Sequence, residues 1–432
     1  MTKIRQLIPR EILDSRGVPT IETRIILDDG TTASGSSPSG TSKSSYEAFE
    51  ARDGDPTRYD GMGVQKAIQT ILGTIAPKLI GLEVTDQRLI DRTLIELDGT
   101  KTKSNLGGNT IYSVSQAVAK TAAKSVFQPV FLYLRNFISK DNLPLKIPTP
   151  AMSLINGGLH AGNNVDLQEF LVIPATYQTF SDSLVMGSAV YKNIRVQLEK
   201  NHLVTTIGDE GGFAPVFEKN EDVFELIAQA VSAASWRLGY DIFLGVDASA
   251  KNFFSEGFYK IKDKGTAMKS PDLITLYSEL IKKYHILYLE DPLAEDDWEG
   301  WTAILSQLSQ NALIVGDDLT ATNPLRLQMA LNKNAINGIV IKPNQIGTVI
   351  ESLAVVEIAR HAGQKIIVSH RSGETNDDFI ADFSVAVAAD YVKFGGPARG
   401  ERVAKYNRLL QIEAQIMQAG GKDSSSNTGK LT

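Results

Sequence analysis

Six residues that could do chemistry follow short runs of aliphatic and β-branched residues in the second half of the chain. Three are carboxylic acids, two are lysines and one is a histidine: Asp247, Glu290, Asp317, Lys342, His370 and Lys393. Because the carboxyl ends of parallel strands meet at one edge, we expect these side chains to lie on the same rim. One such residue alone is more often a solvated loop charge, but six together indicate a reactive site.

The three acids of this set supply only oxygen ligands. Hard ions such as Mg²⁺ or Mn²⁺ prefer oxygen donors to the histidine and cysteine ligands that zinc usually takes. A lysine held near other cations and a metal has a lowered pKa and acts as a base at neutral pH, and a second lysine can hold a substrate carboxylate. Either Lys342 or Lys393 could instead pair with a carboxylate of the rim, which would be a structural role.

The apolar runs that carry these residues alternate with longer amphipathic stretches. From residue 286 onward the ends of the runs are about 23 to 28 residues apart, the length of one strand, one helix and two short loops. Two earlier runs, 149–155 and 167–174, bring the expected strands to eight, which would close a barrel. Residues 204–212 lie between two helical patterns and are expected to form a connecting loop. An open, doubly wound sheet is the alternative fold.

The first 140 residues are expected to form a smaller α+β unit. Residues 20–34 alternate apolar and polar around Asp-Asp-Gly, which predicts two antiparallel strands, and helical periodicity follows at 63–81 and 109–127. The predicted organisation is an α+β N-terminal capping domain, an α/β barrel of the (β/α)8 type with irregular first units, and a disordered tail. Their ranges are 1–140, 141–420 and 421–432, with a proline-rich hinge at 141–150.

Composition limits the partners of this chain. Its 432 residues hold 44 Lys and Arg against 50 Asp and Glu, and the net charge of −6 gives no reason to expect nucleic-acid binding. The absence of cysteine excludes disulfides, thiolate metal sites and cysteine nucleophiles. No stretch has the length of a secretory core or a membrane span, so a cytoplasmic enzyme without a membrane partner is expected.

Nine longer motifs occur in an order that resembles the enolase (phosphopyruvate hydratase) family over nearly the whole chain. They are ILDSRGVPT, YEAFEARDGD, INGGLHAGNNVDLQEF, GDEGGFAP, LEDPLAEDDWEGW, VGDDLTATNP, IKPNQIGT, SHRSGETNDDFIADF and PARGERVAKYNRLLQIE. The resemblance implies a lyase of glycolysis and gluconeogenesis. Its reaction would be the reversible dehydration of 2-phospho-D-glycerate to phosphoenolpyruvate, with two Mg²⁺ ions in the active site.

The resemblance also implies a role for each matching residue. Asp247, Glu290 and Asp317 would bind the first ion, and Ser39 would bind the second ion with the substrate phosphate. Lys342 would be the base, and Glu210 would be the acid for the leaving hydroxide. The remaining substrate-binding positions are His160, Glu169, His370, Arg371, Ser372 and Lys393. The family generally forms homo-oligomers, so a homodimer or an octamer is implied.

The chain departs from the family pattern in the lid at residues 34–45. Lys43 stands near the usual threonine and Ser44 stands at the usual glycine, which removes backbone freedom and adds charge near the phosphate. The segment also resembles a phosphate-binding P-loop, but two residues separate its second glycine from Lys43, which argues against one. Two alternatives to a true enolase therefore remain: a related enzyme with an altered substrate, and a non-catalytic binding protein.

Overall fold

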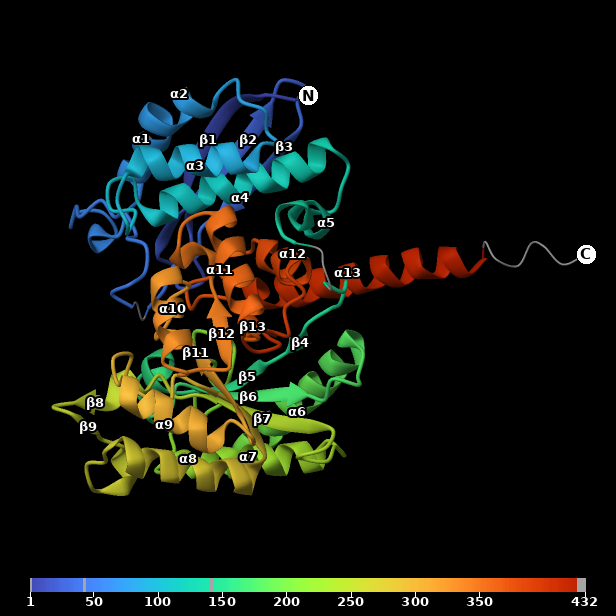
Figure 1. Cartoon of the computed structure of the whole chain (residues 1–432). Helices are drawn as coiled ribbons and strands as arrows, with labels where there is room; N and C mark the ends of the chain where they lie inside the picture. Colours follow the sequence, from blue (N-terminus) through green and yellow to red (C-terminus); the bar gives the residue numbers. More distant parts are fainter. Residues whose placement is uncertain (1, 42–43, 140–142, 426–432) are drawn as a thin grey trace, which may run out of the picture.

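The computed structural model describes residues 2–41, 44–139 and 143–425. Its two parts are a smaller α+β part at the top of Figure 1 and a barrel below it. Among the described residues, no helix is both long enough and apolar enough to cross a membrane. The predicted combination of an α+β N-terminal part and an α/β barrel is confirmed.

The N-terminal part is built on a three-stranded antiparallel sheet in the order β1-β2-β3. The predicted hairpin at 20–34 is present as its second and third strands. The first strand was not predicted, although its burial also alternates along part of its length. The bounds are β1 Ile4–Leu13, β2 Pro19–Leu27 and β3 Thr32–Ser36.

Helices cover one face of this sheet, and α4 is the most deeply buried of them. The close approach of α4 explains Gly35 in β3, because a Cβ there would lie 2.6 Å from the backbone nitrogen of Ala117. The helices of this part are η1 Tyr59–Gly61, α1 Gln65–Thr70, η2 Ile71–Ile75, α2 Ala76–Leu79, α3 Gln87–Asp98, α4 Gly108–Ser125, α5 Val130–Leu134 and η3 Arg135–Phe137.

The barrel sheet has the order β4-β14-β13-β12-β11-β10-β7-β6-β5. The two end strands, β4 and β5, follow each other directly in the sequence and are separated only by Ala151. The sheet therefore closes on itself, and the open, doubly wound alternative is wrong. The bounds are β4 Thr149–Pro150, β5 Met152–Asn156, β6 Glu169–Pro174, β7 Ile242–Asp247, β10 Ile286–Glu290, β11 Leu313–Gly316, β12 Gly338–Ile341, β13 Lys365–Ser369 and β14 Tyr391–Lys393.

The irregular opening of the barrel is also as predicted. Strands β5, β6 and β7 pair antiparallel, and the later pairs are parallel. Residues 204–212 form the expected connection between the helices α6 Phe180–Lys200 and α7 Asn220–Ala233, with Ile207 contributing an isolated bridge. A further hairpin, β8 Phe254–Ser255 with β9 Phe258–Tyr259, follows β7.

Helices surround the strands of the barrel (Figure 1). They are α6 Phe180–Lys200, α7 Asn220–Ala233, α8 Ser270–Tyr284, α9 Trp298–Leu308, α10 Pro324–Asn332, α11 Val349–His361, α12 Phe379–Ala386 and α13 Gly400–Ser425, with short turns η4 Gly158–Ala161, η5 Ala250–Phe253, η6 Lys262–Lys264 and η7 Pro343–Gln345. Residues 421–425 of the expected tail fall within α13. Residues 426–432, and residues 140–142 at the expected hinge, lie outside the described part.

The interior of the barrel consists of two layers. Because side chains alternate along a strand, residues two apart share one face. The lower layer is a buried apolar cluster of Ala151, Leu171, Ile173, Tyr288, Val315, Val340 and Ile367. The upper layer lies two residues away along the chain and contains Ser153, Glu169, Glu290, Asp317, Lys342 and Ser369, of which Glu169 precedes Leu171 because β6 runs antiparallel to its neighbours. The barrel therefore holds a polar layer on an apolar floor, at the carboxyl ends of its parallel strands.

Candidate active site

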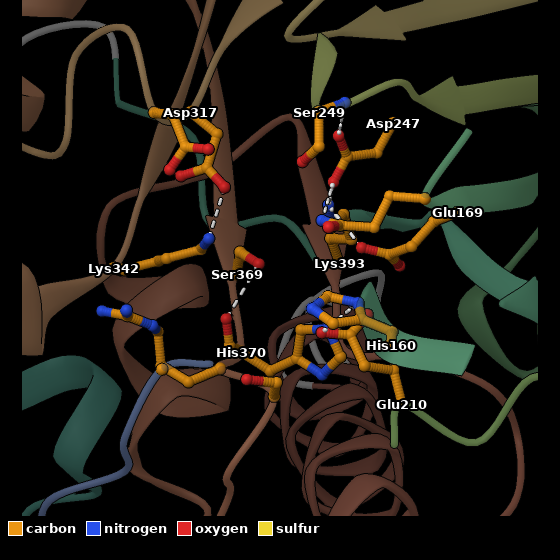
Figure 2. A pocket seen from close by; sticks show the side chains of 15 residues that line it. His160, Glu169, Glu210, Asp247, Ser249, Asp317, Lys342, Ser369, His370 and Lys393 are labelled. Carbon is orange, nitrogen blue, oxygen red and sulfur yellow. Dashed lines mark hydrogen bonds and ion pairs between the residues drawn. The ribbon is translucent and has the colours of Figure 1, made fainter. Parts of the chain in front are cut away.

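A buried polar pocket opens at this end of the barrel (Figure 2). Ten of the twelve predicted site residues line it: His160, Glu169, Glu210, Asp247, Asp317, Lys342, His370, Arg371, Ser372 and Lys393. The two exceptions are Glu290, which is fully buried beside Lys393, and Ser39, which belongs to the N-terminal part. Most of these residues, although far apart in sequence, converge because they end a strand or lie in the loop after it, whereas Glu169 begins β6 and Glu210 lies in the connection between two helices.

Lys393 is the centre of charge on one side of the pocket. Its Nζ lies 2.9 Å from Glu169 Oε1, 2.9 Å from Asp247 Oδ2 and 2.7 Å from Glu290 Oε1. Burial opposes the positive charge, but these carboxylates outweigh it and raise the pKa of Lys393 well above its usual value. The lysine therefore stands where a cation would be held by the same acids.

Lys342 and Asp317 form an ion pair on the other side of the pocket. Burial again opposes the lysine charge, but Asp317 raises the pKa of Lys342. The lowered lysine pKa expected from the sequence refers to a site that holds a metal, and it stays a prediction. The second oxygen of Asp317, Oδ1, is buried without a hydrogen-bond partner in the described part of the chain.

Asp291 shapes the backbone on which Asp317 sits. Its two carboxylate oxygens accept hydrogen bonds from the backbone N–H groups of Asp317 and Asp318, at 3.0 and 2.7 Å. Acidic oxygens of all three residues come within 4.8 Å of one another. Asp291 thus orients a predicted metal ligand, although sequence reasoning passed over it as the second acid of LEDP.

A second group of titratable residues gathers around Glu210. Its carboxylate lies 3.4 Å from His160 Nδ1 and 3.5 Å from His370 Nε2. Burial raises the pKa of Glu210, but the two histidines more than offset this effect and hold that pKa well below its usual value. Burial, and then the Glu210 charge, raise the pKa of Glu169 to about 8. Glu169, rather than Glu210, therefore carries the proton of this acid pair near neutral pH.

The N-terminal part closes over the pocket from above. The Arg371 guanidinium donates to Glu47 Oε2 at 2.8 Å, and the hydroxyl of Ser372 accepts from the backbone N–H of Thr41 at 2.8 Å. The backbone of Ser39 pairs with that of Gly373 in both directions. Ser372 and Gly373 are thereby tied to the described part of the lid, and Arg371 is tied to Glu47 just after it.

Ser39 does not line the pocket, because other groups occupy its polar atoms. Its hydroxyl donates to Asp14 Oδ2 and accepts from Arg16, both at 2.8 Å, and its carbonyl accepts from Gly373. Ser44, which stands at the glycine position of the family pattern, also contacts the barrel. Its hydroxyl donates to Glu295 at 3.1 Å. Lys43, the added lid charge, lies outside the described residues.

Comparison with known proteins covers both parts of the chain. The model of the enolase N-terminal domain matches residues 4–134, and that of the enolase C-terminal TIM barrel domain matches residues 144–428. The chain belongs to the enolase family. The enolase of Beutenbergia cavernae is 46% identical over 419 residues, which are 97% of both chains. The enolase of Acidothermus cellulolyticus is 46% identical over 97% of this chain and 96% of its own.

Membership of the enolase family makes this chain a hydro-lyase and implies a divalent metal cofactor. The donor chemistry fits a hard cation, because the polar layer holds buried carboxylates and Asp317 Oδ1 has an unused lone pair. The three predicted ligands are not gathered around one point. Asp247 and Glu290 meet at Lys393, whereas Asp317 meets Lys342.

Several residues of this enolase-family site were not predicted from the sequence. Gly40, Gln168, Ser249, Asp318 and Ser369 also line the pocket. Arg402 donates to Nδ1 of His370 at 2.6 Å from helix α13. Gln168 and Asp318 are sequence neighbours of the predicted residues Glu169 and Asp317, so their position in the sequence could have indicated that they line the pocket. Arg402 comes from a helix after the last strand, and no local pattern relates it to a rim histidine.

Proposed function

We propose that this chain catalyses the magnesium-dependent, reversible dehydration of 2-phospho-D-glycerate to phosphoenolpyruvate. The observation that carries the proposal is the division of one buried pocket into two sides (Figure 2). Lys342 lies on one side, the acids Glu169 and Glu210 lie on the other, and Lys393 lies between them. A base and an acid on opposite sides are what removal of a proton and a hydroxide from adjacent carbons requires.

Lys342 is proposed to remove the proton from the carbon next to the substrate carboxylate. It must first give up its own proton, and the pull of Asp317 is what holds that proton in place. Any cation that engages Asp317 lowers the pKa of Lys342 toward neutrality. Lys393 would hold the substrate carboxylate, because it places a buried positive charge between the two sides of the pocket.

The acid pair is proposed to protonate the leaving hydroxide. Glu169 holds a proton with a pKa of about 8, and Glu210 lies between two histidines that can stabilise its charge. The pair of acids therefore carries one proton before the reaction. That proton is transferred to the leaving hydroxide, which departs as water. His160, Arg371 and Ser372 would bind the phosphate end, with the guanidinium as a fork.

Asp247, Glu290 and Asp317 would hold the first Mg²⁺, and Ser39 would take part in holding a second. When bound, Mg²⁺ supplies positive charge that stabilises the developing dianion of the substrate carboxylate. The same acids are now neutralised by Lys342 and Lys393. The number of ions and the identity of the metal belong to this proposal.

The first test is turnover. With Mg²⁺ and 2-phosphoglycerate, we expect ultraviolet absorbance from the new double bond, and we expect none after chelation. Lys342→Ala should lower kcat by about 10²- to 10⁴-fold with ligand binding retained, because it removes only the base. Lys365→Ala, a half-exposed lysine paired with Asp390, is the matched control and should keep parental turnover. A parent without turnover, together with a Lys342→Ala variant that binds ligand normally, would exclude catalysis.

An altered lid is the alternative to a true enolase that the structure can address. The described lid residues contact the barrel through Thr41 and Ser44, which favours a lid able to close. Replacing Lys43-Ser44 by Thr-Gly tests the departure directly. Unchanged turnover and KM would show that the departure is neutral, whereas a gain of turnover would show that this lid limits the enzyme.

The assembly and the location are also proposals. We propose a homo-oligomer, either a dimer or an octamer, with no nucleic-acid or membrane partner, in the cytoplasm. Light scattering on the purified protein distinguishes a mass of one 47.0 kDa chain from a multiple of it. A monomer with full turnover would reject the oligomer and leave the chemistry intact.

A further inference from the structure

Tyr288 lies in the apolar floor directly beneath the polar layer of the barrel. It precedes Glu290 by two residues in β10, so both side chains share the inner face of the strand. Its ring is fully buried in the interior cluster that includes Ile173 and Val315. A buried tyrosine is stable in an apolar layer only when its hydroxyl finds a hydrogen-bond partner.

The partner of that hydroxyl is the carboxylate of Glu290. Tyr288 donates to Oε2, and Lys393 donates to Oε1 at 2.7 Å. The two donors differ in a way that matters for a metal site. The positive charge of the Lys393 ammonium neutralises Glu290 as a metal ion would, so the lysine competes with a metal ion for this carboxylate. The Tyr288 phenol is neutral, so it can hold Oε2 without competing with the ion.

The surrounding barrel accommodates this ring. Gly245 in β7 is the register partner of Tyr288, and a Cβ at Gly245 would lie 3.1 Å from the Cβ of Tyr288. On another strand, Tyr391 packs edge-on against Tyr288 with ring centroids 6.5 Å apart. The hydroxyl of Tyr391 makes no hydrogen bond to Glu290 among the described residues. Tyr391 is thus a partly buried neighbour of the floor, whereas Tyr288 belongs to the floor and reaches the polar layer.

We propose that Tyr288 is a positioning residue of the metal site. Its hydroxyl would fix Oε2 of Glu290, and Oε1, which now accepts from Lys393, would be left to bind Mg²⁺ in place of the lysine. This inference rests on the metal ligands of the proposed function and adds a residue outside them. Outer partners of ligating carboxylates set their orientation, and their loss typically weakens metal binding 10- to 100-fold. Without the phenol, Oε2 of Glu290 would be a buried acceptor with no donor.

The experiment compares Tyr288→Phe with Tyr391→Phe, because each variant removes one hydroxyl, from a tyrosine of the apolar floor or from a tyrosine packed against that floor. Mg²⁺ is titrated by calorimetry into each metal-free, full-length protein without substrate. We expect the Kd for Mg²⁺ to rise about tenfold or more in Tyr288→Phe and to change less than about twofold in Tyr391→Phe. Turnover of Tyr288→Phe should return toward the parental kcat as Mg²⁺ is raised, which a purely structural defect would not do.

Three results would overturn the role of Tyr288. They are unchanged Mg²⁺ affinity in Tyr288→Phe, equal weakening in both variants, and a Tyr288→Phe protein that does not fold with or without Mg²⁺. The last result would show that the hydroxyl serves the core rather than the ligand. A parent protein that binds no Mg²⁺ would instead overturn the metal site of the proposed function, so the two failures are distinguishable.

Discussion

The two histidines beside Glu210 have the same neighbour but opposite protonation. Burial lowers the pKa of His370 to about 3, and the positive charge of Arg402, which donates to its Nδ1, acts in the same direction. Since Nδ1 accepts that bond, the proton of neutral His370 is on Nε2, facing Glu210. Burial also opposes charge on His160, but Glu210 outweighs it and raises the pKa of that imidazole.

Titration of these histidines should separate them clearly. In the ligand-free protein we expect His370 to remain neutral down to about pH 4, and His160 to keep its proton above pH 6.5. Proton NMR of the imidazole signals between pH 4 and 8 measures both, with His160→Asn and His370→Asn providing assignments. Two signals that titrate together would show that the Arg402 contact does not decide the charge of His370.

Residues at strand ends were predictable because a single rule places them. Parallel strands expose their carboxyl ends together, so Asp247, Asp317 and Lys342 could be assigned to one rim from spacing alone. The rule says nothing about partners, and therefore it did not show that Lys393 is paired with three acids. It also says nothing about Ser39, whose environment depends on how the two parts of the chain pack.

At the scale of elements, the loop that carries His160 depends on a neighbouring helix. Asn220 is the first residue of α7, and its Oδ1 accepts from the backbone N–H groups of Asp166 and Leu167, both at 3.0 Å. Its amide nitrogen donates to the Asp166 carboxylate at 3.1 Å. One buried side chain thus holds the end of the 157–166 loop against the barrel.

Asn220→Ala should release this loop. We expect kcat to fall and KM to rise, together about tenfold in kcat/KM, because a positioning contact for His160 is lost while every acid and lysine remains. Steady-state kinetics and hydrogen exchange over residues 157–167 measure the effect. The control is Asn193→Ala on α6, whose side-chain amide donates to the carbonyl of Ala189 in the same helix. Equal losses in both variants would contradict the loop role.

The antiparallel start of the barrel was harder to predict in detail than the strands that follow. Runs such as 286–290 are short, apolar and evenly spaced. These properties together predict that each run is a strand and that successive strands are parallel. Strands β6 and β7 are instead separated in the sequence by two helices, α6 and α7, and they pair antiparallel. The first strand of the chain was missed because charged residues interrupt its apolar pattern.

At the scale of the whole molecule, the N-terminal part caps a helix of the barrel. Asp91 in α3 accepts from the backbone N–H of Ile350, and Ser115 in α4 accepts from that of Val349, both at 3.0 Å. These amides begin α11, which follows the loop after Lys342. Burial raises the pKa of Asp91 to about 7. Asp91, which lies at the contact between the two parts, therefore titrates near neutral pH.

The stability of the protein should fall with pH because of Asp91. Its pKa is about 7 in the folded chain and 3.8 as its ordinary value, so the folded state binds more protons between these limits. Stability is then greatest below about pH 4 for this group and decreases up to about pH 7, by about 2 kcal/mol between pH 5 and 7. Tm measured from pH 5 to 8 should decline less in Asp91→Asn than in the parent. Parallel curves would contradict the assignment.

The closure of the barrel has a consequence for how the chain is made. The segment at 149–156 forms both ends of the sheet, and its second neighbour is the strand at 391–393. A ribosome delivers these two strands more than half a chain apart, so the ring cannot close until nearly all of the sequence has emerged. Until then the nascent protein presents two unpaired edges, which makes premature termination before residue 391 a route to aggregation.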